Sequence, residues 1–351
     1  MNLIQPAQKP WVVVVGGFLG AGKTSLILAA ARVLAQKGLR SAVILNDQGN
    51  ELVDTRYAEK HGIPSGEITG GCFCCKFSDL TAAMERVRSH VPDVIFAEPV
   101  GSCTDLVATV LSPLLQEFDS YRVAPFTVLV DPARAASLLS DDAEPNTSFL
   151  FRKQLQEADL VCMTKSDLDL DSASISDIKT RYLSAKTGSG VREWLDETLS
   201  GDLRAGTKTL EIDYEQYARA EAALAWLNLS FTFEPECPAT PASVIGPFMD
   251  YLDEALTSAA IPIVHLKMMV TSPAGWLKAA ICTNGEEPVI EGDLDASPAS
   301  VHEVIVNLRA TGSPAQVQQI VVRELRYFVG NVHNSRLNCF SPAPPKPERK
   351  R

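Results

Sequence analysis

Several features are scarce or missing in this sequence, and each absence excludes a class of protein. The opening segment MNLIQPAQKP contains no apolar signal core, and no apolar run reaches the roughly 18 residues that a membrane span requires. Only five histidines are present and they form no tract, so a metal-storage arm is not indicated. The formal net charge of −11 opposes binding to a polyanion. We therefore expect a cytoplasmic protein whose main partner is neither a membrane nor nucleic acid.

Cysteine is also uncommon, but its distribution is uneven. The chain has 351 residues and eight cysteines, and three of these, Cys72, Cys74 and Cys75, occur within the stretch TGGCFCCKF. Cytoplasmic proteins rarely contain disulfides, because their compartment keeps thiols reduced. Clustered cysteines in such a protein indicate metal binding or redox chemistry.

A glycine-rich loop follows the first apolar run of the chain. The run WVVVVGG, residues 11–17, is typical of a strand buried on both faces, and it leads into a helical segment that ends at Gly38. From Gly17 the sequence matches G-x-x-x-x-G-K-[ST], whose backbone amides surround phosphate oxygens. Lys23 would contact the β- and γ-phosphates, and the Thr24 hydroxyl would bind magnesium. The predicted phosphate-binding residues are Gly17, Gly20, Ala21, Gly22, Lys23, Thr24 and Ser25.

Two short motifs later in the chain indicate which base is bound. TKSD, residues 164–167, follows an apolar stretch, and SAKTG begins at Ser184. They resemble the base-reading elements of P-loop GTPases and occur in the same order. One carboxylate accepts hydrogen bonds from both guanine N1–H and N2–H, a donor pair that adenine lacks. We therefore predict GTP as the nucleotide, contacted by Lys165, Asp167, Ser184, Ala185 and Lys186.

Two loops between these motifs are candidates for the catalytic and moving parts. Asp47 follows the apolar run SAVILN, and Glu98 ends the apolar run VIFA with Gly101 close behind. An acid in such a position holds magnesium through a water or orients the attacking water, and a glycine lets the loop follow the γ-phosphate. We predict catalytic roles for Lys23, Asp47 and Glu98. Either acid could instead be a surface cap or turn residue.

Taken together, these motifs resemble one family. The combination of GGFLGAGKT, the loop after Asn46, GGCFCC, a strand ending in E-x-x-G and a K-x-D element is similar to the CobW family of metal-chaperone GTPases, which is related to HypB and UreG. The resemblance covers residues 11 to about 200, and the chain departs from the usual pattern at Gln48, Pro99 and Thr164. It implies magnesium-dependent GTP hydrolysis coupled to delivery of Zn2+, Co2+ or Ni2+ held by Cys72, Cys74 and Cys75. The implied partner is a recipient protein or an enzyme of a cobalamin-related pathway, and a homodimer is left open.

The chemistry of the thiols agrees with a transfer site. Borderline-soft cations prefer thiolate, and three thiolates from one loop form one face of a tetrahedral site. A fourth ligand has to come from elsewhere: Cys103, His61, a carboxylate, water or the recipient. Two other interpretations stay open at this point, a redox pair formed by Cys72 and Cys75, and thiols that only fill space.

The rest of the chain predicts a second, smaller domain. LNLSFTFE alternates apolar and polar residues, and further short strands and an amphipathic helix follow. We predict an N-terminal extension at 1–10, a P-loop NTPase G domain with a mainly parallel α/β sheet at 11–207, and an α+β domain with an antiparallel sheet at 208–340. The remaining residues, 341–351, form a basic, proline-rich segment that we expect to be disordered.

Two other function classes compete with a metal-delivering GTPase. A small-molecule phosphotransferase or ATPase uses the same P-loop scaffold, but it would lack a guanine preference. A GTP-binding module with a purely structural zinc would unfold on chelation, and its metal affinity would not depend on the nucleotide.

Overall fold

The computed structural model describes residues 9–49, 53–168 and 180–350, and the chain divides into two compact units. The first unit comprises 1–48, 54–217 and 345–351, and the second comprises 49–53 and 218–344. Residues 1–8 of the predicted N-terminal extension lie outside the described residues. Among the described residues, no helix has both the length and the apolar character needed to cross a bilayer.

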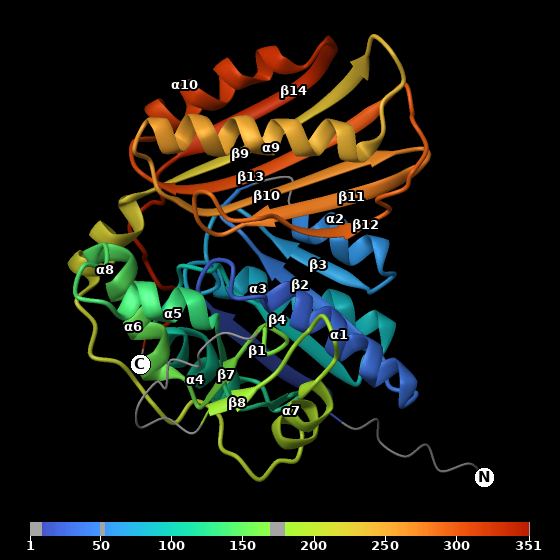
Figure 1. Cartoon of the computed structure of the whole chain (residues 1–351). Helices are drawn as coiled ribbons and strands as arrows, with labels where there is room; N and C mark the ends of the chain where they lie inside the picture. Colours follow the sequence, from blue (N-terminus) through green and yellow to red (C-terminus); the bar gives the residue numbers. More distant parts are fainter. Residues whose placement is uncertain (1–8, 50–52, 169–179, 351) are drawn as a thin grey trace. The chain divides into compact units, whose positions relative to one another are not determined.

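The first unit is built on a parallel sheet (Figure 1). Its strand order is β3 (Ser65–Ile68), β2 (Ser41–Asn46), β4 (Val94–Glu98), β1 (Trp11–Gly17), β6 (Thr127–Val130), β7 (Leu160–Met163) and β8 (Thr180–Tyr182), and β5 (Arg122–Val123) also pairs with β1. Every pairing in this sheet is parallel. The predicted α/β fold of the N-terminal part is therefore confirmed.

Strand β1 lies in the middle of this sheet because its residues tolerate burial on both faces. Its valines at positions 12 to 15 are fully buried, between the neighbouring strands β4 and β6. At its end, Gly17 has a φ of +136°, and a Cβ there would lie 2.6 Å from the carbonyl oxygen of Leu129. Only glycine fits at this point, where the chain leaves the sheet.

Parallel strands need long crossover connections, and the helices of this unit lie within or after these connections. They are α1 (Lys23–Gln36), α2 (Val53–Lys60), α3 (Phe77–Val87), α4 (Ser112–Glu117), α5 (Pro132–Leu139), α6 (Pro145–Glu157) and α7 (Val191–Thr198), with short helical turns at Arg88–His90 and Val107–Leu111. Helix α1 ends where predicted: Gly38 has a φ of +74°, and the N–H of Leu39 donates to the carbonyl of Leu34 at 3.0 Å.

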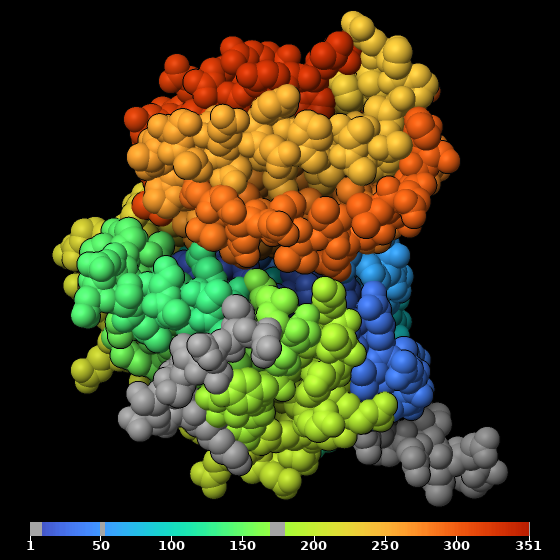
Figure 2. Space-filling model, viewed as in Figure 1, coloured from blue at the N-terminus to red at the C-terminus, as the bar shows by residue number. Residues whose placement is uncertain are grey.

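The second unit is an antiparallel sheet covered on one face by two helices (Figure 1). Helix α8 (Tyr214–Ala222) leads into the strand order β12 (Val289–Gly292), β11 (Gly275–Ile281), β10 (Ile263–Ser272), β13 (His302–Thr311), β9 (Leu224–Pro235) and β14 (Gly330–Phe340). The helices α9 (Pro241–Ser258) and α10 (Pro314–Glu324), with a short turn at Leu325–Tyr327, complete the unit. Helix α9 forms a band along the surface of this unit (Figure 2). The predicted antiparallel α+β domain is confirmed.

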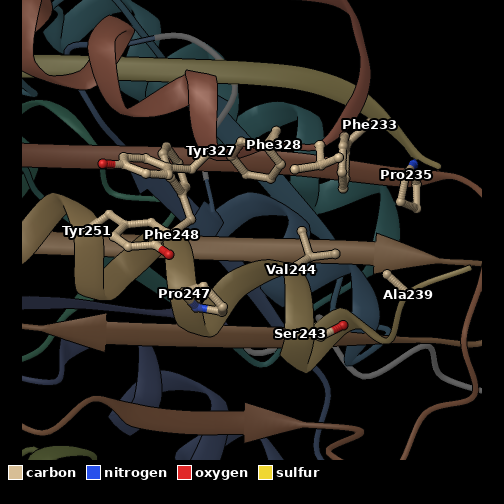
Figure 3. Close-up of a pocket in the computed structure, with 11 residues that line it drawn as sticks. Phe233, Pro235, Ala239, Ser243, Val244, Pro247, Phe248, Tyr251, Tyr327 and Phe328 are labelled. Carbon is tan, nitrogen blue, oxygen red and sulfur yellow. The ribbon is translucent and has the colours of Figure 1, made fainter. Parts of the chain in front are cut away.

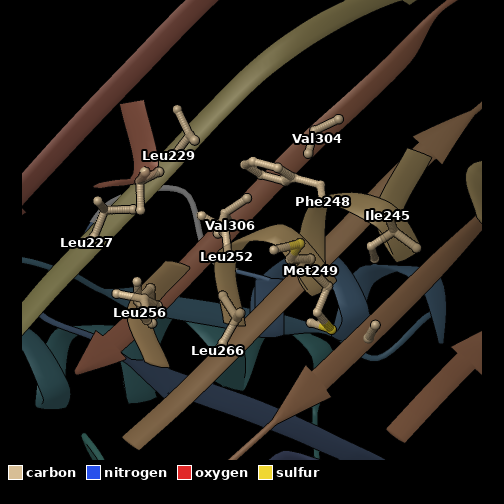
Figure 4. Packing of buried hydrophobic residues seen from close by; sticks show 14 of the residues in the cluster. Leu227, Leu229, Ile245, Phe248, Met249, Leu252, Leu256, Leu266, Val304 and Val306 are labelled. Carbon is tan, nitrogen blue, oxygen red and sulfur yellow. The ribbon is translucent and has the colours of Figure 1, made fainter. Parts of the chain in front are cut away.

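The core of the second unit lies between α9, α10 and the sheet. In Figure 4, Phe248, Met249 and Leu252 of α9 point toward Leu266 and Val306 of the sheet. A cavity of about 210 Å³ opens beside this core, where the rings of Phe233, Phe248 and Phe328 pack edge to face (Figure 3). Its described lining contains no carboxylate, imidazole, amine or thiol, and its polar side chains are the hydroxyl groups of Ser243, Tyr251 and Tyr327.

A buried carboxyl group holds the segment that follows β4. Glu157, the last residue of α6, is fully buried and accepts hydrogen bonds from the Thr104 hydroxyl and the Val107 N–H, both at 3.1 Å. Burial, which outweighs these hydrogen bonds, raises the pKa of Glu157 to about 8, and the nearby Asp105 adds to the increase. The carboxyl is therefore protonated in the folded protein at neutral pH.

We predict that Glu157→Gln removes part of the pH dependence of stability. The unfolded chain ionises this residue near 4.5 and the folded chain near 8, so its contribution to the unfolding free energy is complete below pH 4.5 and is lost as the pH rises to 8. The loss amounts to a few kcal/mol, because one pKa unit corresponds to about 1.4 kcal/mol. Urea unfolding at pH 5 and pH 8 measures it. An equal decrease in the wild-type and variant proteins would contradict the assignment.

Candidate nucleotide and metal sites

The phosphate-binding loop connects β1 to α1. Gly20 and Gly22 have φ values of +80° and +88°, and this left-handed backbone lets the loop turn before α1 begins at Lys23. The buried Lys23 ammonium donates to the carbonyl oxygens of Gly17, at 2.9 Å, and Phe18, at 3.3 Å. The ammonium therefore lies over the loop, beside the N-terminus of α1, where anions are stabilised.

Three oxygen-bearing side chains meet at Thr24. Its hydroxyl lies 2.9 Å from the nearer carboxylate oxygen of Glu98, at the end of β4, and 3.1 Å from Oδ1 of Asp54, in the first turn of α2. One hydroxyl proton cannot be donated to two carboxylates at once. Hard oxygen ligands gathered in this way suit Mg2+, so the residues present fit the cation that a nucleotide phosphate requires.

The contacts of Asp47 involve β3. Its N–H donates to the carbonyl of Ile68 at the end of β3, and its charge adds to the effect of burial that raises the pKa of Glu67. The acids at the Thr24 hydroxyl are Glu98 and Asp54. The catalytic role predicted for Asp47 stays a prediction.

The two base-reading motifs come together at the ends of β7 and β8. The Ser184 hydroxyl donates to Oδ1 of Asp167 at 2.6 Å, and the Ser166 N–H donates to the carbonyl of Leu183. Lys165 has a φ of +55°, and its ammonium pairs with Asp131 at 2.6 Å. Residues that are far apart in sequence thus form one polar cluster, with the carboxylate of Asp167 oriented by its neighbour.

The cysteine loop lies between β3 and α3 and is held by Asn46 at the end of β2. The Asn46 amide donates to the carbonyls of Ile68, at 3.1 Å, and Gly71, at 2.7 Å, and it accepts from the Phe73 N–H at 2.8 Å. Asn46 uses both its donor and its acceptor on this loop. A single buried amide therefore couples the end of β2 to the shape of the loop.

The three thiols form a compact cluster. The Sγ atoms of Cys72 and Cys74 are 2.8 Å apart, those of Cys72 and Cys75 are 3.2 Å apart, and those of Cys74 and Cys75 are 3.7 Å apart. All three are free thiols; Cys72 and Cys74 are buried and Cys75 is half-buried. They form the group of described residues best arranged to hold a metal ion.

Hydrogen bonds among the thiols shift their pKa values in opposite directions. Contacts with Cys103, Cys74 and Cys75 lower the pKa of Cys72 well below its usual range. The pKa of Cys74 is raised, chiefly by its contact with Cys103, and the contact with Cys72 raises the pKa of Cys75 to about 11. Cys72 is thus the thiol that ionises first, and a cation in the cluster would replace the protons of the others.

Lys346 and Glu348 contact this loop, in the part of the chain for which disorder is expected from sequence. The Lys346 N–H donates to Sγ of Cys75 at 3.1 Å, and the Glu348 N–H donates to the carbonyl of Cys74 at 2.9 Å. The carboxylate of Glu348 accepts from the N–H of Ser78 at 2.8 Å, in the first turn of α3. Composition indicates disorder for this segment because it contains few apolar residues, whereas these contacts use mainly its backbone and one carboxylate.

Two residues of these sites were not among the candidates from sequence. Asp54 belongs to the loop region that suggested Asp47, but no spacing rule shows which acid reaches Thr24. Asn46 is the polar end of an apolar run, and its role depends on a loop that begins more than 20 residues later. A polar residue that ends a buried strand is the signal that identified Glu98, and the same signal could have identified Asn46.

Comparison with known proteins places these motifs in context. A family model described as CobW/HypB/UreG, nucleotide-binding domain, matches residues 11–191. The zinc chaperone YjiA of Escherichia coli (strain K12) is 29% identical over 161 residues, which cover 45% of this chain and 49% of the relative. The zinc chaperone CobW of a Sinorhizobium species is 29% identical over 201 residues, which cover 47% of this chain and 53% of the relative. The chain thus spans about half the length of these relatives.

Solved structures give similar comparisons at lower identity. HypB from Helicobacter pylori in complex with nickel has a TM-score of 0.44 at 16% identity, covering 57% of this chain and 92% of that chain. Zinc-bound YjiA GTPase from E. coli has a TM-score of 0.35 at 14% identity, covering 90% of this chain and 99% of that chain.

We predict that Asn46→Asp weakens zinc binding by the cysteine loop. The variant keeps an acceptor for the Phe73 N–H but loses both donated hydrogen bonds, and it places a carboxylate oxygen against the carbonyls of Ile68 and Gly71. Loss of such supporting contacts typically lowers metal affinity by about 10- to 100-fold. Chelator competition on the reduced protein measures the change. Asn331→Asp, at an exposed position of β14, is the control for the added charge, and equal affinities in all three proteins would contradict the role of Asn46.

Proposed function

The chain belongs to the CobW/HypB/UreG family, and from this premise we propose that it is a magnesium-dependent GTPase that delivers a divalent transition metal held by its cysteine loop. The observation that carries the proposal is the group of three thiols within 3.7 Å of one another, on a loop tied by Asn46 to the sheet that bears the phosphate-binding loop. Relatives that are named zinc chaperones support zinc as the cargo, with cobalt or nickel as chemically similar alternatives.

The nucleotide proposed is GTP. Asp167 would accept from guanine N1–H and N2–H, and the Ser184 hydroxyl that donates to it holds the carboxylate in place. Lys165 would place its aliphatic stem along the base, and the backbone of Ala185 and Lys186 would meet the guanine carbonyl. An adenine base would leave the Asp167 carboxylate without this donor pair.

Hydrolysis would transfer the γ-phosphoryl group to water and release GDP and phosphate. Lys23 would exchange its loop carbonyl partners for phosphate oxygens, and Glu98 would orient the attacking water. Magnesium would be held by Thr24, with Glu98 and Asp54 beside it, and it supplies charge neutralisation at the phosphates. Sequence motifs mark no arginine for the developing charge, so we expect slow turnover by the protein alone.

The metal would be cargo, taken up by thiolates and passed to a recipient. Cys75 is half-buried, whereas Cys72 and Cys74 are buried, so a ligand from another protein could approach the metal from the side of Cys75. A metal-recipient protein, or an enzyme of a cobalamin-related pathway, is the proposed partner, and a homodimer is an additional option. The Sγ separation of 3.2 Å between Cys72 and Cys75 exceeds a disulfide bond of about 2.05 Å, in keeping with the thiol form that metal binding needs.

We predict that the zinc affinity of the reduced protein depends on the nucleotide. Chelator competition in the presence of GDP and then of a non-hydrolysable GTP analogue should give affinities that differ by about tenfold or more, a coupling free energy of about 1.4 kcal/mol. Cys74→Ser should abolish both the binding and the difference. Cys237→Ser, which removes an exposed thiol of the second unit, should leave both unchanged.

Other results of this experiment would favour the competing functions. Equal zinc affinities, with unfolding when zinc is removed, would make the metal structural. Turnover of ATP as fast as GTP, or a phosphorylated product in place of free phosphate, would favour a phosphotransferase or an ATPase.

A further inference from the structure

A fourth thiol reaches the cysteine cluster from another loop of the same unit. The side chain of Cys103 is hydrogen-bonded to the thiols of both Cys72 and Cys74, and it is 1% exposed. Cys103 follows β4, whereas the other three thiols follow β3. The cluster therefore contains thiols from two loops at the same edge of the parallel sheet.

Cys72, Cys74 and Cys75 are spaced for a common ion, and Cys103 adds a thiol in contact with two of them. A tetrahedral zinc ion with sulfur at about 2.3 Å needs sulfur–sulfur distances of roughly 3.8 Å. The Sγ distances among Cys72, Cys74 and Cys75 are 2.8, 3.2 and 3.7 Å, so an ion would move these three thiols apart by about 1 Å or less. Cys103 contacts Cys72 and Cys74, the two thiols of the cysteine loop that are 5% and 1% exposed. Water therefore has little access to this part of the cluster.

The backbone around Cys103 is fixed by α6. The Gln154 side-chain amide donates to the carbonyls of Gly101, at 3.0 Å, and Cys103, at 2.8 Å. The Cys103 N–H donates to the carbonyl of Val100 at 3.0 Å, which closes a turn. Together with the hydrogen bond from Thr104 to Glu157, these contacts hold the thiol in place without any ion.

The same loop begins at the nucleotide site. Glu98 accepts a hydrogen bond from the Thr24 hydroxyl. Gly101 packs closely against Leu19 of the phosphate-binding loop, because a Cβ at Gly101 would lie only 2.8 Å from Cδ2 of Leu19. Only four residues separate Glu98 from Cys103. A shift of this loop on GTP hydrolysis would therefore be transmitted directly to a ligand of the metal.

We propose that Cys103 is the fourth ligand of the metal and the residue through which the metal site responds to the nucleotide. The inference rests on the proposed function, because it needs a metal at Cys72, Cys74 and Cys75. In this arrangement Cys72, Cys74 and Cys103 are the inner ligands, and the loop after β4 controls the position of Cys103. Cys75 is the outer ligand, from which transfer begins.

X-ray absorption of the zinc-loaded protein tests this by counting sulfur neighbours. We expect four sulfurs in the wild-type protein and three sulfurs with one lighter ligand in Cys103→Ser. The variant should lose at least about tenfold in zinc affinity, and its affinities with GDP and with the GTP analogue should become equal. Cys162→Ser, at a buried cysteine of β7, is the control for loss of an interior thiol and should keep four sulfurs.

The count on the wild-type protein does not depend on how well a variant folds. Three sulfurs around zinc in the wild-type protein would overturn the inference and leave the proposed function intact. No zinc binding by the wild-type protein would overturn both.

The C-terminal segment gives a second, independent inference about Cys75. Pro345 and Pro347 restrict the backbone on both sides of Lys346, whose N–H donates to Sγ of Cys75. Glu348 binds both the N–H and the hydroxyl of Ser78, at 2.8 and 2.6 Å. Segment 345–350 thus lies over the half-buried thiol of the cluster and belongs to the same compact unit.

The attachment of this segment is weak enough to be reversible. Arg349 lies 3.6 Å from Glu117 and 5.9 Å from the ring centre of Phe77, and the Lys350 ammonium lies 4.0 Å from that of Tyr214. Exposed contacts of this kind each contribute little to stability. We infer that segment 345–350 is a detachable cover of Cys75, which a recipient must displace before it takes the metal.

The rate of Cys75 alkylation in the metal-free, full-length protein tests the cover. We expect Glu348→Ala to speed alkylation by about tenfold, because it removes two hydrogen bonds to a charged acceptor. Lys346→Ala should react like the wild type, because Lys346 contacts the thiol through its main-chain N–H. Peptide mass spectrometry separates Cys75 from the exposed Cys237. Equal rates in the wild-type protein and in Glu348→Ala would overturn the inference.

Discussion

The chemistry of this protein depends on one constraint, that parallel strands all end at the same edge of a sheet. Strand β4 lies between β2 and β1, so Glu98 stands between the loop held by Asn46 and the phosphate-binding loop. Strands β7 and β8 bring Asp167 and Ser184 to the same edge. Adjacent loops can therefore hold a nucleotide and a metal, and no additional helix or strand is needed to connect the two sites.

Charge at this edge is arranged for cations. The hydroxyl of Thr24 stands between two carboxylates, and the cysteine loop gathers thiols that lie mostly out of contact with water. Bringing anions together in a buried site is unfavourable unless a cation accompanies them or protons neutralise them. This is the physical reason why magnesium and a softer metal suit these two positions. The loop from Glu98 to Cys103 contacts Thr24 at one end and the thiol of Cys72 at the other.

The second unit contributes a different kind of structure. Its antiparallel sheet buries an apolar core under α9 and α10, and the described lining of its aromatic cavity contains no carboxylate, imidazole, amine or thiol. Helix α9 is continuous from Pro241 to Ser258 even though Pro247 lies inside it, because packing of Phe248, Met249 and Leu252 stabilises it. A proline inside a helix removes one backbone donor and usually kinks or breaks the helix, so tertiary packing outweighs that local preference here.

The sequence alone determined the features that depend on neighbouring residues. Glycines followed by Lys23 and Thr24 after a run of valines allow one local structure, and three cysteines within four positions must share a site wherever the loop lies. Only the tertiary structure decided which distant groups join them. Asp54 at Thr24, Asn46 on the cysteine loop, Cys103 beside Cys72 and the chain end over Cys75 all depend on strand order and on backbone hydrogen bonds. Such contacts depend on how separate segments pack, and the local spacing of residues in the sequence does not predict them.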